Sequence, residues 1–445
     1  MYNSLYKMSI PFGSNIINDL LLIGGVFLIS IITTIGGVGG GGLLIPLYTL
    51  SGSFDLKTSI PLTILTISGD TLVRIYYLYN KPHPLSEKRD IIYFYPLLLI
   101  TLFDANTSFF GVILSNYTPD IMTISCLIGI LLITFYKSIH KAIDTYIKET
   151  EYLNNPNSNY TLVIIDGIGE YFKLSEIKKL IIGEDIDIEF SPNGDDPVII
   201  DNIEVRIQTD DEKEEHNEEI EKYGDKQIDK YYCTGIMGFN IGILSIFSIT
   251  REFFNVCTYT YWLHVAGQFI TTCGLGYYTI NYIITDYNKK RNSQYIFIKG
   301  DIVWDDNIIK KFILIGSFTG FISTYIGIGG GMLITPIMIQ VGMIPEVVVA
   351  TSSVSTLFSC IISTINYYSS GDLPLLYGLT FAGSSAIGSY FGIHASDYIL
   401  QKYQKQSIII FIVSLIVFLS IILLTVNAID SKMFDNSNFN DICIE

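Results

Sequence analysis

The chain has 445 residues, of which 49% are hydrophobic and only 16% charged, and its formal net charge is −16 at pH 7. About a quarter to a third of the residues on a soluble protein's surface are charged, so this composition argues against a soluble globular protein. The acidic balance also argues against nucleic-acid binding, because phosphate recognition needs a basic surface.

Long apolar runs recur along the chain, and a helix that crosses the hydrocarbon core of a bilayer needs about 20 such residues. We expect membrane spans at 16–36, 57–80, 91–115, 119–137, 234–251, 257–284, 308–328, 345–368, 373–394 and 407–427. Two shorter apolar pieces, 41–51 and 331–343, each follow a glycine cluster and are too short to span alone. The fold class is therefore predicted to be an all-α polytopic membrane protein.

A polar region separates two membrane halves. The expected division is a first transmembrane half (1–137), an acidic soluble insert (138–232), a second transmembrane half (233–428) and a polar C-terminal tail (429–445). Within the insert, β-branched runs at 161–166, 179–190 and 197–207 predict short strands. The acidic run at 210–221 is typical of a solvated linker. We therefore expect a small α/β or partly disordered insert.

The glycine clusters belong to an internal repeat. The segment GGVGGGGLLIP at 36–46 aligns without a gap with IGIGGGMLITP at 326–336, and the same register pairs Thr63 with Ser353. Each glycine destabilises a helix by about 1 kcal/mol relative to alanine, and Pro46 and Pro336 loosen the helix further. Each half is therefore predicted to contain a helix that is broken at membrane depth.

A broken helix exposes backbone groups that hydrocarbon cannot satisfy, so the break must be buried in protein or line a wet cavity. Paired breaks in corresponding halves indicate the central site of a transporter. The N-terminal ends of the short helices after the breaks would suit an anion. Close packing of helices through small residues is the alternative explanation of the glycines.

The two glycine–proline motifs, the half-repeat layout and the stretch DLKTSIPLTILTISG at 55–69 resemble the sulfite exporter TauE/SafE family, in particular its eukaryotic members. The resemblance covers both membrane halves and leaves the insert unexplained. It implies an exporter-like secondary transporter of a small anion, sulfite or an organosulfonate in the named cases. The second half has ATSS at 350–353 where the first has IPLT at 60–63, so two equivalent sites are not expected.

Ionisable residues within membrane spans are costly and often functional. Asp70 and Arg74 lie four residues apart on one helical face. They are either a structural ion pair, or an anion contact (Arg74) beside a gate or proton carrier (Asp70). Asp104 and His264 are further candidates for proton coupling, and hydrogen-bonded packing is the alternative role for both. Hydroxyl groups at 351–356 follow the second glycine break and could donate to an oxyanion.

These observations predict a transporter that moves its anion by alternating access at a site between the two breaks. The candidate substrate-binding residues are Gly39, Gly40, Gly41, Pro46, Thr63, Arg74, Gly329, Gly330, Gly331, Pro336, Ser352 and Ser353. The coupling candidates are Asp70, Asp104 and His264. No cofactor or metal site is expected. The expected partners are the small anion and the lipid bilayer, with proton coupling and the oligomeric state left open.

Two other function classes stay open: a membrane-anchored receptor or scaffold whose acidic insert is the working part, and a passive anion channel. An enzyme is not expected, because motifs such as HExxH and GxSxG are missing. Basic residues gather in the connections 81–89, 137–148 and 289–311, and the positive-inside rule predicts that these connections and the insert are cytosolic. The repeats are parallel if the two short pieces turn back and inverted if both complete a crossing of the membrane. We favour inverted repeats.

Overall fold

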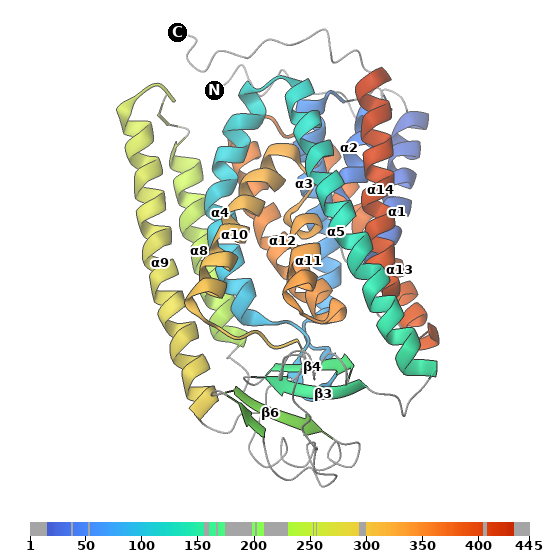
Figure 1. The fold of residues 1–445 in the computed structure, drawn as a ribbon. Coiled ribbons are helices and arrows are strands. Elements are labelled where there is room, and N and C mark those ends of the chain that lie inside the picture. Colours follow the sequence, from blue (N-terminus) through green and yellow to red (C-terminus); the bar gives the residue numbers. More distant parts are fainter. Residues whose placement is uncertain are drawn as a thin grey trace.

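The computed structural model describes residues 16–36, 39–51, 54–154, 160–165, 168–173, 198–200, 203–208, 230–251, 253–254, 256–292, 300–403 and 407–430. Helices dominate this part of the chain (Figure 1). Those before the insert are α1 (Ile16–Gly36), α2 (Gly41–Leu50), α3 (Leu56–Leu78), α4 (Phe94–Tyr117) and α5 (Asp120–Asn154). Those after it are α8 (Lys230–Arg251), α9 (Tyr259–Asn292), α10 (Asp306–Ile326), α11 (Gly330–Val341), α12 (Pro345–Ser369), α13 (Leu375–Tyr403) and α14 (Ser407–Asp430).

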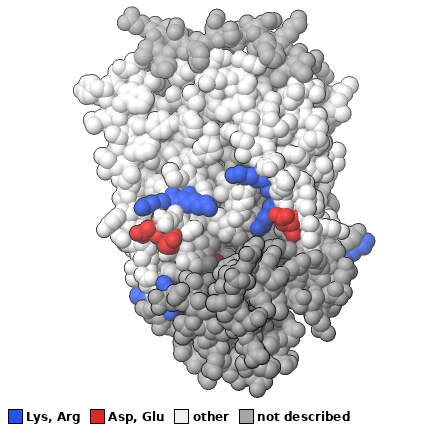
Figure 2. Space-filling model, viewed as in Figure 1, with Lys and Arg blue, Asp and Glu red and all other residues white. Residues whose placement is uncertain are grey.

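Six helices of the described residues are long and apolar enough to cross a bilayer: α1, α4, α8, α10, α12 and the Asp120–Ile147 part of α5. Helices α3, α9 and α13 have spanning length without the same apolar character, and the apolar part of α14, Ile410–Val426, is shorter. On the face drawn in Figure 2, charged side chains gather towards one end and leave a broad uncharged region. The predicted all-α polytopic membrane fold is confirmed.

Two sheets interrupt the helices. A hairpin of β1 (Pro82–His83) and β2 (Ser86–Asp90) follows α3. Within the insert, β3 (Tyr160–Ile165), β4 (Ile168–Lys173), β5 (Val198–Ile200) and β6 (Ile203–Gln208) form an antiparallel sheet in the order β4-β3-β6-β5. The strand predicted at 161–166 corresponds to β3, and the run at 197–207 divides into β5 and β6. The run at 179–190 and the acidic run at 210–221 lie outside the described residues.

Polar contacts identify the two ends of the helical bundle. At one end, Lys81 after α3 forms an ion pair with Asp397 near the end of α13, with 2.8 Å between Nζ and Oδ1. We call it the insert end, because the insert sheet follows α5 there (Figure 1). At the opposite end, the Asn116 amide near the end of α4 donates to Asp372, just before α13, at 2.9 Å. Helices α3 and α13 therefore run towards the insert end, and α4 runs away from it.

The first helices of the two repeats run in opposite directions. Helix α1 packs parallel to α13, since Ser30 bonds Ser385 and, one turn later in both helices, Thr34 bonds Ser389. Helix α10 packs parallel to α4, with glycines of α10 directly against the α4 backbone. Because α13 runs towards the insert end and α4 away from it, α1 and α10 are antiparallel. The repeats are thus inverted, which is the arrangement that the sequence favoured.

Candidate functional site

The two glycine breaks lie against each other in the interior of the bundle. A Cβ atom added to Gly41 would lie 2.3 Å from the Ile328 Cα, and one added to Gly331 would lie 3.5 Å from the Gly39 nitrogen. All four residues are buried. Any side chain at position 41 would therefore collide with the backbone of the other repeat, which explains the glycine there. The structure thus brings together the two clusters that the sequence predicts as one site.

Each short helix begins at its break without a side-chain cap. Helix α2 follows Gly40 and α11 follows Gly329, and neither N-cap residue offers a side-chain acceptor to the first turn. Gly329 also has a φ of 72°, in the left-handed region that favours glycine. The first N–H groups of a helix lack intrahelical partners and carry the positive end of the helix dipole. Both helix starts can therefore attract a negative group.

Hydroxyl groups lie beside both breaks. A Cβ at Gly331 would approach the Thr356 hydroxyl of α12 to 2.5 Å, and one at Gly42 would approach the Ser420 hydroxyl of α14 to 2.6 Å. Further along α11, Thr335 donates to Ser352 at 3.0 Å. The hydroxyl row of α12 therefore lines the second break, and the hydroxyls of Thr33 and Ser420 lie beside the first.

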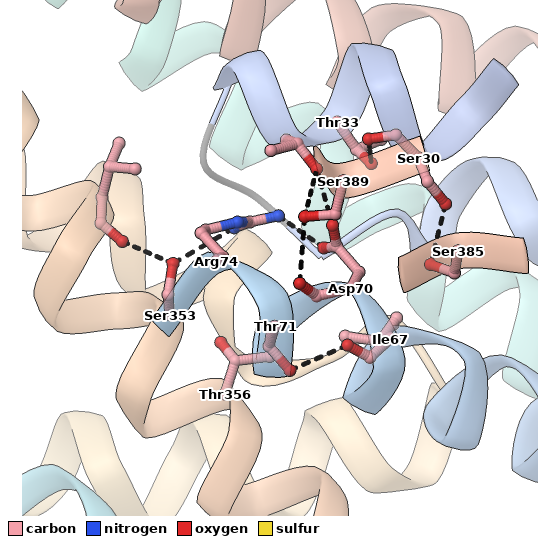
Figure 3. Close-up of polar contacts among 12 residues, drawn as sticks. Ser30, Thr33, Ile67, Asp70, Thr71, Arg74, Ser353, Thr356, Ser385 and Ser389 are labelled. Atoms are coloured by element: carbon pink, nitrogen blue, oxygen red, sulfur yellow. Dashed lines mark hydrogen bonds and ion pairs between the residues drawn. The ribbon is translucent and has the colours of Figure 1, made fainter. Parts of the chain in front are cut away.

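Arg74 and Asp70 form a buried ion pair on α3, each with at most 3% of its side chain exposed. The Arg74 Nη1 donates to the Ser353 hydroxyl of α12 at 3.2 Å (Figure 3). Thr34 of α1 donates at 2.6 Å to Oδ1 of Asp70, the oxygen that is not paired with Arg74. Among the described residues, the Arg74 Nε has no acceptor. The pair therefore connects three helices inside the bundle, and its remaining donor can serve an anion.

A cavity of about 40 Å³ reaches this pair from the insert end. The buried Arg74 and Thr34 line the cavity. Lys81 and Asp397 line it too, and the side chains of their ion pair are about two-fifths exposed. A space of this size holds a few water molecules. It gives the Arg74 guanidinium a route towards one side of the membrane.

Asp104 of α4 lies beside the second break. Its side chain is fully buried, and its Oδ1 accepts from Thr319 of α10 at 3.3 Å. A Cβ at Gly330 would lie 3.7 Å from the same oxygen. The other carboxylate oxygen has no hydrogen-bond partner among the described residues. Asp104 is therefore placed next to the start of α11.

The remaining predicted residues are Pro46, Pro336, Thr63 and His264. Pro46 and Pro336 are buried inside α2 and α11. The Thr63 hydroxyl is buried without a partner in the described part of the chain. His264 lies on α9, where its Nε2 is 2.7 Å from the Thr250 hydroxyl of α8. This is the packing contact that the sequence offered as the alternative for His264, which is not part of the cluster at the breaks.

Two residues beside the Asp70–Arg74 pair were not predicted from the sequence. Thr34 and Ser389 both contact Asp70, through its side chain and its backbone carbonyl respectively. The repeat offered a signal for one of them, because the ungapped register pairs Thr34 with Thr324. Ser389 lies far along the chain on α13, and no local pattern distinguishes it.

Comparison with known proteins gives consistent matches. The family model "Sulfite exporter TauE/SafE" matches residues 231–420. The chain is 24% identical over 396 residues to sulfite exporter TauE/SafE family protein 3 of Arabidopsis thaliana, which covers 87% of this chain and 74% of that protein. It is 26% identical over 416 residues to family protein 2 of the same plant, covering 90% and 81% respectively. No solved structure matches the chain significantly. The resemblance carried by the glycine motifs is thereby confirmed: the chain is similar to sulfite exporter TauE/SafE family proteins over most of its length.

Proposed function

We propose that this protein is a secondary transporter that carries a small anion, sulfite or an organosulfonate, across a membrane. One observation carries the proposal: two helix breaks from inverted repeats meet in the bundle interior, each beside an uncapped helix start, and α3, which contacts both breaks through Ile67, also carries the buried Arg74. Such paired breaks are the usual place of a transporter's substrate site. The two plant proteins are named as members of the sulfite exporter family, which suggests the class of anion.

The proposed site uses three kinds of donor. The first N–H groups of α11 and α2 supply the positive ends of two helix dipoles. The hydroxyls of Ser353 and Thr356 supply hydrogen bonds from α12, and Arg74 supplies a full positive charge. The Nε–H of Arg74, which has no acceptor among the described residues, suits an oxygen of a sulfite or sulfonate group. Repulsion of the Asp70 carboxylate is offset by its pairing with Arg74.

Alternating access would move two bodies against each other around this site. Helix α1 packs on α13 of the other half, and α10 packs on α4 of the first half. We therefore assign α1, α3 and α13 to one body and α4, α10 and α12 to the other. Their border runs between α3 and α12, where Arg74 bonds Ser353. The cavity at the insert end would be the route in one of the two states.

The orientation follows from charge. Lys81, Arg89 and Lys230 lie at the insert end, where each pairs with an acidic residue. By the positive-inside rule this end is cytosolic, with the insert on the same side and the start of α1 on the other. The division at 138 and 232 into two membrane halves and a soluble insert is part of this proposal. Export would begin at the cytosolic cavity.

The test is uptake of labelled sulfite, sulfate and methanesulfonate into proteoliposomes that contain the full chain. We expect saturable uptake of at least one of these anions. A second protein, in which a flexible Gly/Ser linker replaces 160–208, should transport equally well, because the proposed site lies wholly within the helices. Uptake that rises linearly with concentration would indicate a channel. Loss of uptake only in the linker protein would favour a receptor or scaffold that works through its insert.

A further inference from the structure

A buried carboxyl group, Asp104, lies beside the second break, and the first repeat has a serine in the corresponding place. Asp104 of α4 lies where α10 packs most closely, since a Cβ at Gly320 would be 2.0 Å from the Asp104 carbonyl oxygen. The repeat register pairs Gly320 with Ser30, and Ser30 contacts Ser385 of α13. Ser385 thus takes the place of Asp104 in the first repeat. The two helix starts at the breaks therefore have different electrostatic surroundings.

The Asp104 carboxylate lies beside the first residue of α11. Its Oδ1 lies 3.7 Å from the Cβ position of Gly330, the first residue of α11. Its second oxygen is buried and has no partner in the described part of the chain. A negative group at a helix start is stabilised by the dipole and by the unpaired N–H groups. An ionised Asp104 would therefore be stabilised at the start of α11 in place of a substrate anion.

Uncharged groups surround this carboxylate. Helix α10 contributes the Thr319 hydroxyl, and α12 contributes the Ser359 hydroxyl and the Cys360 thiol, which also lies within electrostatic reach of Asp70 on α3. No basic side chain of the described residues forms an ion pair with Asp104.

The two cations on the neighbouring α8 are directed elsewhere, and Lys230 pairs with Asp90. Arg251 bonds the side chains of Gln268 and Asn366, and α8 presents the apolar Leu244 to α4 beside Asp104. A buried carboxylate without a cationic partner is costly when ionised. Taking up a proton removes that cost, and a second negative charge at the same break increases it.

We propose that Asp104 is a built-in competitor of the transported anion, and that its protonation admits the anion to the α11 start. In the ionised state the carboxylate interacts with the N–H groups at the start of α11 and repels the substrate. When Asp104 takes up a proton, the N–H groups of α11 become available to the substrate. One proton therefore loads with each anion, and a monoanion crosses with no net charge. This inference rests on the proposed anion transport and assigns its coupling to Asp104.

The experiment measures binding of methanesulfonate to the purified full chain in nanodiscs at about pH 5.5 and about pH 7.5. Sulfonate keeps its single charge over this range, so any pH dependence belongs to the protein. Wild-type affinity should fall by about tenfold for each pH unit once Asp104 is ionised. Binding at the higher pH should take up about one proton per anion, read with a pH indicator in weak buffer.

The decisive variant is Asp104→Asn, which keeps the shape and removes the charge. Its affinity at the higher pH should match the wild-type affinity at the lower pH, with no proton uptake. The matched control is Asp19→Asn, because Asp19 is also a buried acid of a membrane helix but contacts Tyr377, away from both breaks. This control should keep the wild-type pH dependence. If Asp104→Asn does not fold, Asp104→Ser copies the residue of the first repeat.

The outcomes separate this inference from the proposed function. Binding that is independent of pH in the wild type, or a wild-type pH dependence in folded Asp104→Asn, would overturn the role of Asp104 and leave anion transport standing. Folded wild-type protein that binds none of methanesulfonate, sulfite and sulfate at either pH would overturn both.

Discussion

At the scale of single residues, the Asp70–Arg74 pair allows two explanations. The pair could serve only to neutralise two buried charges, since removing one partner of a buried ion pair costs about 3–5 kcal/mol. It could also present Arg74 to the substrate. The hydrogen bond from Arg74 to Ser353 and the open Nε favour the second role, because a purely structural pair has no need of a cavity at its side.

Neutralising both residues separates these explanations. The single variant Arg74→Gln should lose uptake under either explanation, because it leaves Asp70 as an unpaired buried charge. The double variant Asp70→Asn with Arg74→Gln has no uncompensated charge, so it should insert and unfold like the wild type. If Arg74 binds the anion, the double variant still shows a loss of about ten- to a hundredfold in kcat/KM for sulfite uptake, since a charged hydrogen bond is worth about 1.5–3 kcal/mol. Recovered uptake in the double variant would assign the pair a structural role alone.

At the scale of elements, the breaks depend on contact between backbones. Gly41 faces the backbone of Ile328 at a distance that no Cβ can occupy. Gly41→Ala should therefore force α2 and α11 apart, at a cost of about 1–3 kcal/mol or more, and lower the thermal midpoint together with uptake. Gly24→Ala in α1 is the matched control, because nothing lies within 4 Å of its Cβ position. Alanine there should raise the midpoint slightly through helix propensity. Equal midpoints for the two variants would contradict the close contact.

The helices and strands also show how much of the fold can be predicted from the sequence alone. The apolar runs predicted the long helices to within a few residues, except that α5, α9 and α13 extend well beyond the hydrophobic runs as polar helix. The repeat predicted two breaks, and α2 and α11 begin within them. Strand β4, with the sequence IGEYFK, lacks a β-branched run and was not predicted.

The sequence alone could not predict the spatial neighbours of each site residue, because helices that are distant in the chain supply them. Asp104 meets Thr319 from 215 residues away, and only the parallel contact of α4 and α10 brings it to Gly330. A sequence reading could therefore name Asp104 as a candidate but could not distinguish it from His264, which the fold places in a packing contact with Thr250.

At the scale of the whole molecule, the first helix of each repeat is exchanged with the other half. Helix α1 contacts α13 over much of its length, and α10 contacts α4 in the same way. If the two sequence halves moved as rigid bodies, both interfaces would have to slide. If the bodies are the α1–α3–α13 and α4–α10–α12 groups, both interfaces stay intact and movement occurs between α3 and α12. The glycine-mediated contacts of α10 with the α4 backbone favour the second scheme, because closely packed backbones resist sliding.

A disulfide between the halves distinguishes the two schemes. The hydroxyls of Ser30 on α1 and Ser385 on α13 are 2.8 Å apart, so cysteines at both positions have side chains that face each other closely enough to be joined. This bond connects the two sequence halves but lies inside one proposed body, and oxidation should therefore leave sulfite uptake unchanged. The control joins Thr324 to Ser363, also 2.8 Å apart, within one half and one body. Mass spectrometry of proteolytic fragments would establish that each bond has formed. Uptake that stops on oxidation of the first pair, returns on reduction and persists in the oxidised control would show that the sequence halves are the moving bodies.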